Sequence, residues 1–166
     1  MLIYENNVPP DIRAAFVEKV RTIAGQLGIE PDWLMGVMWV ESRLRPDARN
    51  ATSKATGLIQ FMPDTAVSLG TTIDALRSMD ALAQLDYVLK YLKPYKGRMN
   101  SFVDTYFAIF FPAAIGKPDD WTLHSASMSA AIIAAQNNIY DRNRDGAITV
   151  GEVKASLPAM DTEKKK

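Results

Sequence analysis

The most informative stretch for the fold lies at residues 31–46 and reads PDWLMGVMWVESRLRP. Proline suits the first turn of a helix and ends a helix that is already formed, so Pro31 and Pro46 predict a helix over about residues 32–44. The apolar residues between them recur three and four positions apart, which is the spacing of one helix face. Glu41 falls on that face, where an apolar side chain is expected. The stretch therefore predicts a core helix that carries a carboxyl on its buried side.

The helical period continues along the chain. Apolar spacing predicts further helices over about residues 12–27, 63–70, 80–93, 101–111 and 125–140. Sustained alternation of apolar and polar residues, which marks a half-buried strand, is absent, and there is room only for a small β-hairpin near residues 53–60. The sequence therefore predicts an all-α, or mainly α, fold.

Composition narrows the function classes. The 166 residues include no cysteine, and 19 basic side chains balance 19 acidic ones. A disulfide scaffold, a thiolate metal site and a cysteine nucleophile are excluded, and binding of nucleic acid by charge alone is not expected. The longest apolar runs are too short to span a membrane. We expect a single domain over residues 1–160 that acts as a monomer, followed by a basic tail at residues 161–166.

Glu41 is the first candidate for chemistry. Burial disfavours the charged form of a carboxyl, so its pKa should rise and a proton should remain on it near neutral pH. A general acid needs such a proton. A purely structural alternative stays open, in which Glu41 pairs with Arg43 or Arg45 at the end of its helix.

Two motifs give this carboxyl a context. Glu41-Ser42 is followed by GLIQFMPDTA at residues 57–66, and the pair, in this order, resembles the soluble lytic transglycosylase family and its goose-type lysozyme relatives. The third motif of that family, Ala-Tyr-Asn-x-Gly, is replaced by TYFAI at residues 105–109, where only Tyr106 matches. The resemblance implies a lysozyme-like fold with Glu41 as the catalytic acid. It also implies Ser42, Gln60 and Tyr106 as substrate-binding residues.

The resemblance further implies the reaction and its substrate. The family cleaves the β-1,4 bond between N-acetylmuramic acid and N-acetylglucosamine in peptidoglycan glycan strands and leaves 1,6-anhydro ends. One carboxyl serves as acid and then as base, and none of the other carboxyls weighed as a partner (Asp47, Asp64 and Asp104) stands out. A hydrolysing muramidase of the same fold and a non-enzymatic, calcium-stabilised wall-binding or virion module stay open as alternatives.

Localisation is not fixed by the sequence. The first residues lack the cationic leader and the apolar run of a cleaved export signal. Delivery to the bacterial wall by a phage, or release by a route other than Sec, would agree with this and with the divergent third motif.

A separate motif, which does not belong to the family pattern, lies near the C-terminus at residues 141–152 and reads DRNRDGAITVGE. It matches the twelve-position EF-hand calcium loop, with oxygen donors at positions one, three and five, glycine at six and glutamate at twelve. Because a second EF-hand is absent, we expect a structural Ca²⁺ site and not a signalling switch. The expected ligands are Asp141, Asn143, Asp145, the Ala147 carbonyl, Thr149 and Glu152.

Overall fold

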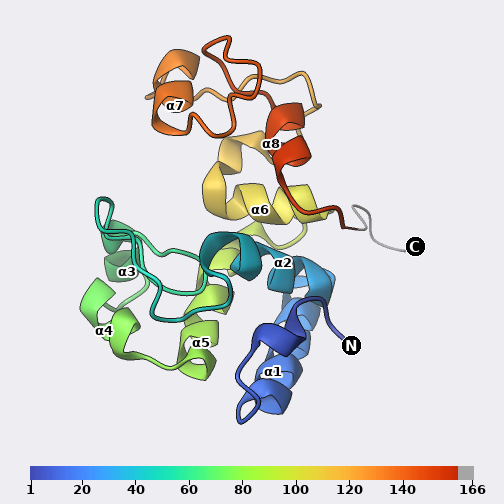
Figure 1. The fold of residues 1–166 in the computed structure, drawn as a ribbon, viewed down its shortest axis with the longest axis vertical. Helices are drawn as coiled ribbons and strands as arrows, with labels where there is room; N and C mark the ends of the chain where they lie inside the picture. The colour runs from blue at the N-terminus through green and yellow to red at the C-terminus, as the bar shows by residue number, and fades with distance from the viewer. Residues whose placement is uncertain (161–166) are drawn as a thin grey trace. The chain divides into compact units, whose positions relative to one another are not determined.

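The computed structural model describes residues 1–160, and the basic tail expected at residues 161–166 lies outside them. The described chain is mainly helical, and it contains isolated β-bridges but no strand (Figure 1). The all-α expectation is therefore confirmed. The chain divides into two compact units, residues 1–97 and the residues from Arg98 onward. The expectation that residues 1–160 act as one domain stays a prediction.

The first unit is built around three longer helices that enclose its core. Helix α1 packs against α2 and against α5, and α3 packs against α4. The elements in chain order are η1 (Glu5–Asn7), α1 (Arg13–Leu27), α2 (Pro31–Ser42), α3 (Pro63–Ser68), α4 (Ile73–Ser78), α5 (Ala81–Leu92) and η2 (Lys93–Tyr95). Helix α4 and the short elements η1 and η2 were not predicted from the apolar spacing.

Helix α2 is the predicted core helix, although it is shorter than expected. It begins at Pro31 and ends at Ser42 instead of near Leu44. Arg43 and Leu44 both adopt the left-handed conformation, with φ angles of 56° and 61°. In this conformation the Leu44 amide turns back to donate to the Met38 carbonyl at 3.3 Å, and its side chain becomes buried. The early end results from a left-handed cap, which satisfies the last carbonyls of the helix.

The hairpin expected near residues 53–60 is reduced to isolated bridges. Thr56 pairs with Arg49 and with Phe61, and no ladder extends beyond these pairs. Between the bridged residues the chain makes a tight turn in which Gly57 and Gln60 have φ angles of 87° and 55°. Left-handed residues reverse the chain too sharply for a regular ladder to continue.

The second unit contains α6 (Phe102–Phe110), η3 (Pro112–Ala114), α7 (Ala130–Gln136) and α8 (Val150–Ser156). The long helix predicted over residues 125–140 is wrong, because only α7 forms there. The reason is competing side-chain capping. Ser125 accepts a hydrogen bond from the Met128 amide and Ser129 caps α7, while Asn137 donates back to the Ile133 carbonyl at 3.0 Å and ends it.

The segment before α7 runs beside the predicted calcium loop. Thr122 forms an antiparallel bridge with Thr149, and the Leu123 amide donates to the Ile148 carbonyl at 2.8 Å. Ile148, at loop position eight, is fully buried. The loop is therefore anchored to the core of the second unit at this position.

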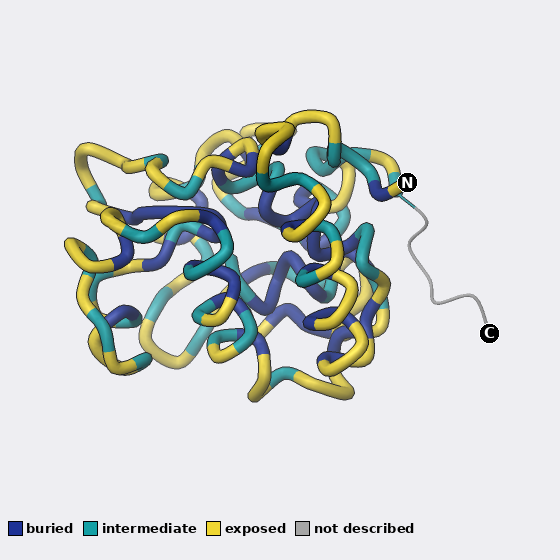
Figure 2. The backbone as a smooth tube through the Cα atoms, turned by 90° about the horizontal axis from the view of Figure 1, so that it is seen from below, coloured by how far each residue is buried: buried dark blue, intermediate teal, exposed yellow. Residues whose placement is uncertain are grey.

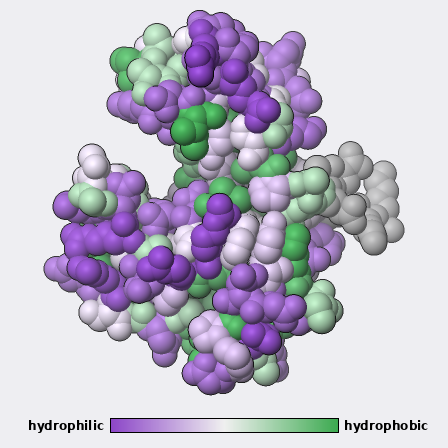
Figure 3. Space-filling model, viewed as in Figure 1, coloured by the Kyte–Doolittle hydropathy of each residue, from purple (hydrophilic) through white to green (hydrophobic). Residues whose placement is uncertain are grey.

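Buried and exposed residues are distributed as expected for packed helices. Figure 2 shows buried backbone mostly on the inner segments and exposed backbone along many outer turns. Polar residues cover most of the face seen in Figure 3, and apolar residues form small separate patches on it. Within residues 1–160, no helix is long and apolar enough to cross a membrane.

Truncating the core of α2 should be costly. Leu34 is 0% exposed, so Leu34→Ala should lower the free energy of unfolding by about 2–5 kcal/mol, through lost burial and the cavity left behind. Val67→Ala is the matched control, because Val67 is 67% exposed, and its effect should stay within about 0.5 kcal/mol. Urea unfolding of both variants measures this. Equal losses would contradict the placement of α2 in the core.

Candidate active site

Glu41 lies in the last turn of α2, and its environment favours a protonated carboxyl. The side chain is partly buried, and this desolvation raises its pKa from 4.5 to about 7. Within residues 1–160 the carboxyl has no hydrogen bond and no ion pair. Every fully buried polar side-chain atom of the described chain does have a partner, so the Glu41 oxygens reach the surface. The carboxyl is therefore desolvated and still accessible.

The two arginines that follow α2 do not neutralise this carboxyl. The Arg43 guanidinium lies over the Trp39 ring, 4.9 Å from its centroid. The Arg45 Nε atom lies 3.3 Å from Asp47 Oδ1, in an exposed ion pair. The alternative in which Glu41 pairs with Arg43 or Arg45 is therefore not the arrangement in this structure.

Helix α5 brings a tyrosine into the neighbourhood of Glu41. Burial, then the neighbouring Tyr95 and then the Glu41 carboxylate raise the pKa of Tyr91 to about 12. The Tyr91 ring also meets the Phe61 ring edge-on, with centroids 6.4 Å apart. Tyr91 thus keeps its proton at neutral pH, and its hydroxyl interacts electrostatically with the Glu41 carboxylate. The sequence patterns did not single it out for this site.

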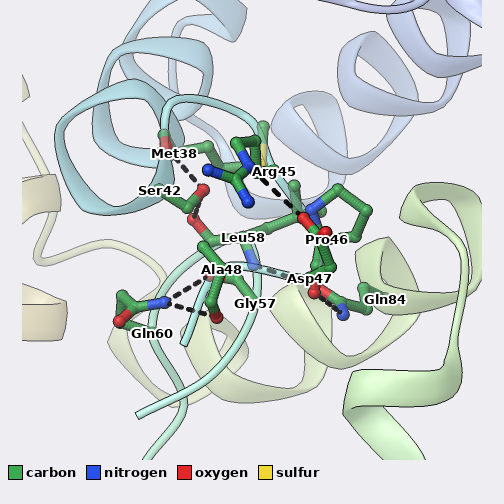
Figure 4. Close-up of polar contacts among 10 residues, drawn as sticks. All are labelled: Met38, Ser42, Arg45, Pro46, Asp47, Ala48, Gly57, Leu58, Gln60 and Gln84. Atoms are coloured by element: carbon green, nitrogen blue, oxygen red, sulfur yellow. Dashed lines mark hydrogen bonds and ion pairs between the residues drawn. The ribbon is translucent and has the colours of Figure 1, made fainter. Parts of the chain in front are cut away.

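Ser42 connects the end of α2 to the turn at residues 57–60. Its hydroxyl is buried, 3.0 Å from the Met38 carbonyl oxygen and 2.9 Å from the Leu58 carbonyl oxygen (Figure 4). The bond to Leu58 joins the residue next to Glu41 to the second family motif. The expected role of Ser42 in substrate positioning stays a prediction, and its hydroxyl is already used within the fold.

Gln60 is the last residue of the turn, and within the described chain only the nitrogen of its side-chain amide is hydrogen-bonded. Its Nε2 atom donates to the Ala48 carbonyl at 3.1 Å and to the Gly57 carbonyl at 3.0 Å. Within residues 1–160 its Oε1 atom accepts no hydrogen bond. The side chain is half-buried and held by its nitrogen. This leaves an oriented acceptor, which suits the hydroxyl and amide groups of a sugar.

Gln84 on α5 is a buried polar residue that the sequence patterns missed. Its side chain is 0% exposed and hydrogen-bonds the Leu58 amide and the carbonyls of Pro46 and Leu76. A signal for it existed, because Gln84 interrupts an apolar helical stripe that continues at Val88 and Leu92. Buried amides in such stripes usually satisfy nearby backbone groups.

Tyr106, the residue that matches the third family motif, belongs to the second unit. It is 2% exposed, and its hydroxyl forms a hydrogen bond with the Tyr140 hydroxyl. Its ring packs against Phe110, with centroids 5.6 Å apart. Within its unit Tyr106 is part of an aromatic core, and its expected role in binding substrate stays a prediction.

The calcium loop folds with its oxygen donors turned toward its own backbone. Asp141 accepts hydrogen bonds from the amides of residues 145 and 146, Asn143 accepts one from residue 145, and Asp145 accepts one from Ala147. Alternate side chains therefore direct their oxygens into the loop. Within residues 1–160, however, no three acidic or histidine side chains are grouped closely enough to form a ready-made metal site.

Glu152 closes this loop. Its Oε1 atom accepts hydrogen bonds from the amides of Arg142 and Asn143, and its Oε2 atom accepts from the amide and the hydroxyl of Thr149 in a capping box. Burial alone would raise the pKa of Glu152, but these hydrogen bonds outweigh it and lower the pKa. Thr149 and Glu152 are therefore anchored to each other at the start of α8.

The other candidates for a second catalytic carboxyl, Asp47, Asp64 and Asp104, lack the desolvated environment of Glu41. Asp47 is paired with Arg45, and Asp64 is exposed at the start of α3. Asp104 accepts hydrogen bonds from the amides of Gly116 and Asn100, at 2.9 and 3.1 Å. Among these carboxyls, only Glu41 combines desolvation with the lack of a partner.

Comparison with known proteins identifies the family of the chain. A family model described as the transglycosylase SLT domain matches residues 18–110, a range that contains Glu41, Ser42, Gln60 and Tyr106 and excludes the calcium loop. A search of curated proteins found no match to the chain. The family supports a lytic transglycosylase-type function on peptidoglycan. Because the match covers more than half of the 166 residues, the chain belongs to the transglycosylase SLT domain family.

Proposed function

We propose that this protein is a lytic transglycosylase that cleaves the β-1,4 bond between N-acetylmuramic acid and N-acetylglucosamine with Glu41 as its one catalytic carboxyl. The observation that carries this proposal is the state of Glu41, a desolvated carboxyl without a partner within residues 1–160 whose pKa is about 7. Such a group holds a proton at neutral pH and can also release it, as an acid that later acts as a base must do.

In the proposed reaction Glu41 first protonates the glycosidic oxygen, so the leaving sugar departs as an alcohol. The positive charge that develops at C1 of the muramic acid is stabilised by the oxygen of its own N-acetyl group. The Glu41 carboxylate then takes the proton of the C6 hydroxyl, and the C6 oxygen bonds to C1. Glu41 is protonated again at the end, and the product carries a 1,6-anhydro ring with no water consumed.

Neighbouring groups have supporting roles in this proposal. The available Oε1 atom of Gln60 suits a hydrogen bond from a sugar hydroxyl or amide. Ser42 would act through its hold on Leu58, and Tyr106 is retained as a substrate-binding residue on the strength of the family motif alone. None of Asp47, Asp64 and Asp104 resembles Glu41 in its surroundings. This favours a route in which the substrate supplies its own nucleophile.

We also propose that the loop at residues 141–152 binds a structural Ca²⁺. Its support is the match of donor types to loop positions and the inward orientation of Asp141, Asn143 and Asp145. The Ala147 carbonyl, Thr149 and Glu152 would complete the set, and Glu152 would have to share its oxygens between the ion and the amides it now accepts from. The ion would pin α8 to the rest of the second unit and would take no part in the chemistry.

A digest of purified peptidoglycan tests the function. The native chain should release muropeptides with 1,6-anhydro ends, which are one water lighter than hydrolytic products by mass spectrometry. Glu41→Gln should lower the rate at least about a hundredfold, because a positioned general acid contributes that much. Glu18→Gln, at an exposed position of α1, is the matched control and should cleave at the native rate. Products with reducing ends would identify a hydrolase, and lysis by the Glu41→Gln variant would exclude Glu41 as the acid.

The raised pKa of Glu41 also predicts a pH-dependent stability. The folded protein prefers the neutral carboxyl, so native stability is lost relative to Glu41→Gln as the pH rises above 4.5, and the loss is complete above about 7. The free energy of unfolding of Glu41→Gln should exceed that of the native chain by up to about 3 kcal/mol above that pH and by almost nothing at pH 4. Urea unfolding across this range measures the gain. For Glu18→Gln the difference should stay within about 0.5 kcal/mol throughout, and the same flat profile for Glu41→Gln would refute the raised pKa.

Calcium should stabilise the protein by binding the folded state. At a free Ca²⁺ concentration about a hundred times the dissociation constant, the free energy of unfolding should rise by about 2.7 kcal/mol. A chelator should remove this gain. Asp145→Asn is the informative variant, because asparagine can keep the bond from the Ala147 amide while it removes one negative charge. Its calcium midpoint in thermal melts should rise about tenfold. Melts that do not respond to calcium in the native chain would remove the proposed site.

A further inference from the structure

Gln84 combines complete burial with complete use of its hydrogen-bonding groups. Its Oε1 atom accepts from the Leu58 amide at 3.0 Å, and its Nε2 atom donates to the Pro46 carbonyl at 2.6 Å and to the Leu76 carbonyl at 2.8 Å. One side chain on α5 therefore holds three separate backbone segments, and Figure 4 shows Gln84 together with two of their residues, Pro46 and Leu58. A buried amide of this kind fixes geometry, because each bond that is lost leaves a desolvated backbone group without a partner.

The residue that matters most is Leu58, whose amide and carbonyl are each held by a side chain. Gln84 accepts from its amide, and the Ser42 hydroxyl bonds its carbonyl at 2.9 Å. Ser42 is the residue after Glu41, at the end of α2. A continuous path of hydrogen bonds thus runs from α5, through the turn at residues 57–60, to the residue beside the proposed acid.

The turn itself depends on a close fit to Gln84. At Gly57, which has a φ angle of 87°, an added Cβ atom would lie 2.5 Å from Gln84 Oε1. Gln60, at the end of the turn, is held at a φ angle of 55°, which costs energy for a residue with a side chain. The turn therefore keeps its strained form because surrounding bonds hold it, and Gln84 supplies the bond to its second residue.

We propose that Gln84 is a positioning residue of the glycan-cleaving site, which holds the turn at residues 57–60 at a fixed place relative to Glu41 and thereby orients Gln60 toward the sugar chain. This inference rests on the proposed function. Gln84 touches no substrate in this role and acts through its hydrogen bond with the Leu58 amide. Its loss should therefore lower the rate of each folded molecule, which a general loss of stability does not do.

Gln84→Met tests this inference, because methionine keeps the length and the unbranched shape of glutamine and removes every hydrogen bond. Leu85→Met is the matched control, since Leu85 is the fully buried neighbour on α5 and has no polar group that could hold the turn. Two quantities are measured for each variant. One is the exchange rate of the Leu58 amide hydrogen by NMR, and the other is kcat on a soluble glycan fragment, normalised to the folded fraction.

In Gln84→Met the Leu58 amide should exchange about tenfold faster than in Leu85→Met, and kcat per folded molecule should fall about tenfold or more. Equal values of either quantity in the two variants would overturn the proposal. If the native chain cleaves no glycan, the proposed function fails, and the exchange rate alone then decides whether Gln84 holds the turn.

A conservative variant covers the case in which Gln84→Met does not fold. Gln84→Glu keeps an oxygen that can accept from the Leu58 amide, and at pH 5.5 burial should keep the new carboxyl neutral. Its Leu58 amide should stay protected to within about threefold of the native rate. Its kcat per folded molecule should fall less than twofold, while exchange or kcat changed by tenfold in this variant would overturn the role of the Leu58 bond.

Discussion

The Glu41 carboxyl is partly buried at the end of α2 without a compensating charge, and the proposed chemistry depends on this constraint. In water a carboxyl loses its proton well below neutral pH, but at the end of α2 the charged form is poorly solvated and the pKa rises to about 7. This arrangement costs stability at neutral pH, and a leucine at the same place would be more favourable. In the proposed function this cost is offset by the use of the proton in catalysis, and membership of the transglycosylase SLT domain family agrees with such a use.

The rest of the first unit keeps this carboxyl in place and keeps cations away from it. Arg43 lies over Trp39, so the nearest guanidinium along the chain is turned to an aromatic ring. Ser42 bonds the Leu58 carbonyl, and Gln84 accepts from the Leu58 amide. The two family motifs, which are separated in sequence, therefore meet at Leu58, whose carbonyl accepts a hydrogen bond from Ser42.

The sequence predicted what periodicity and local chemistry determine, and it failed where side chains compete with the backbone. Helix α2, the position of Glu41 on its buried side and helix α6 were predicted from the apolar spacing. The long helix over residues 125–140 did not form, because Ser129 and Asn137 cap a shorter one. Gln84 was missed for a related reason. Its partners are backbone groups far away in the chain, and no local pattern records them.

The most direct test is an NMR titration of the Glu41 side-chain carboxyl, with the Glu41→Gln variant used to assign its signal. We expect this group to titrate at about pH 7, well separated from exposed carboxyls. A midpoint near 4.5 would show a carboxylate that is charged at neutral pH. That result would exclude Glu41 as the general acid, because such a group has no proton to give to a glycosidic oxygen.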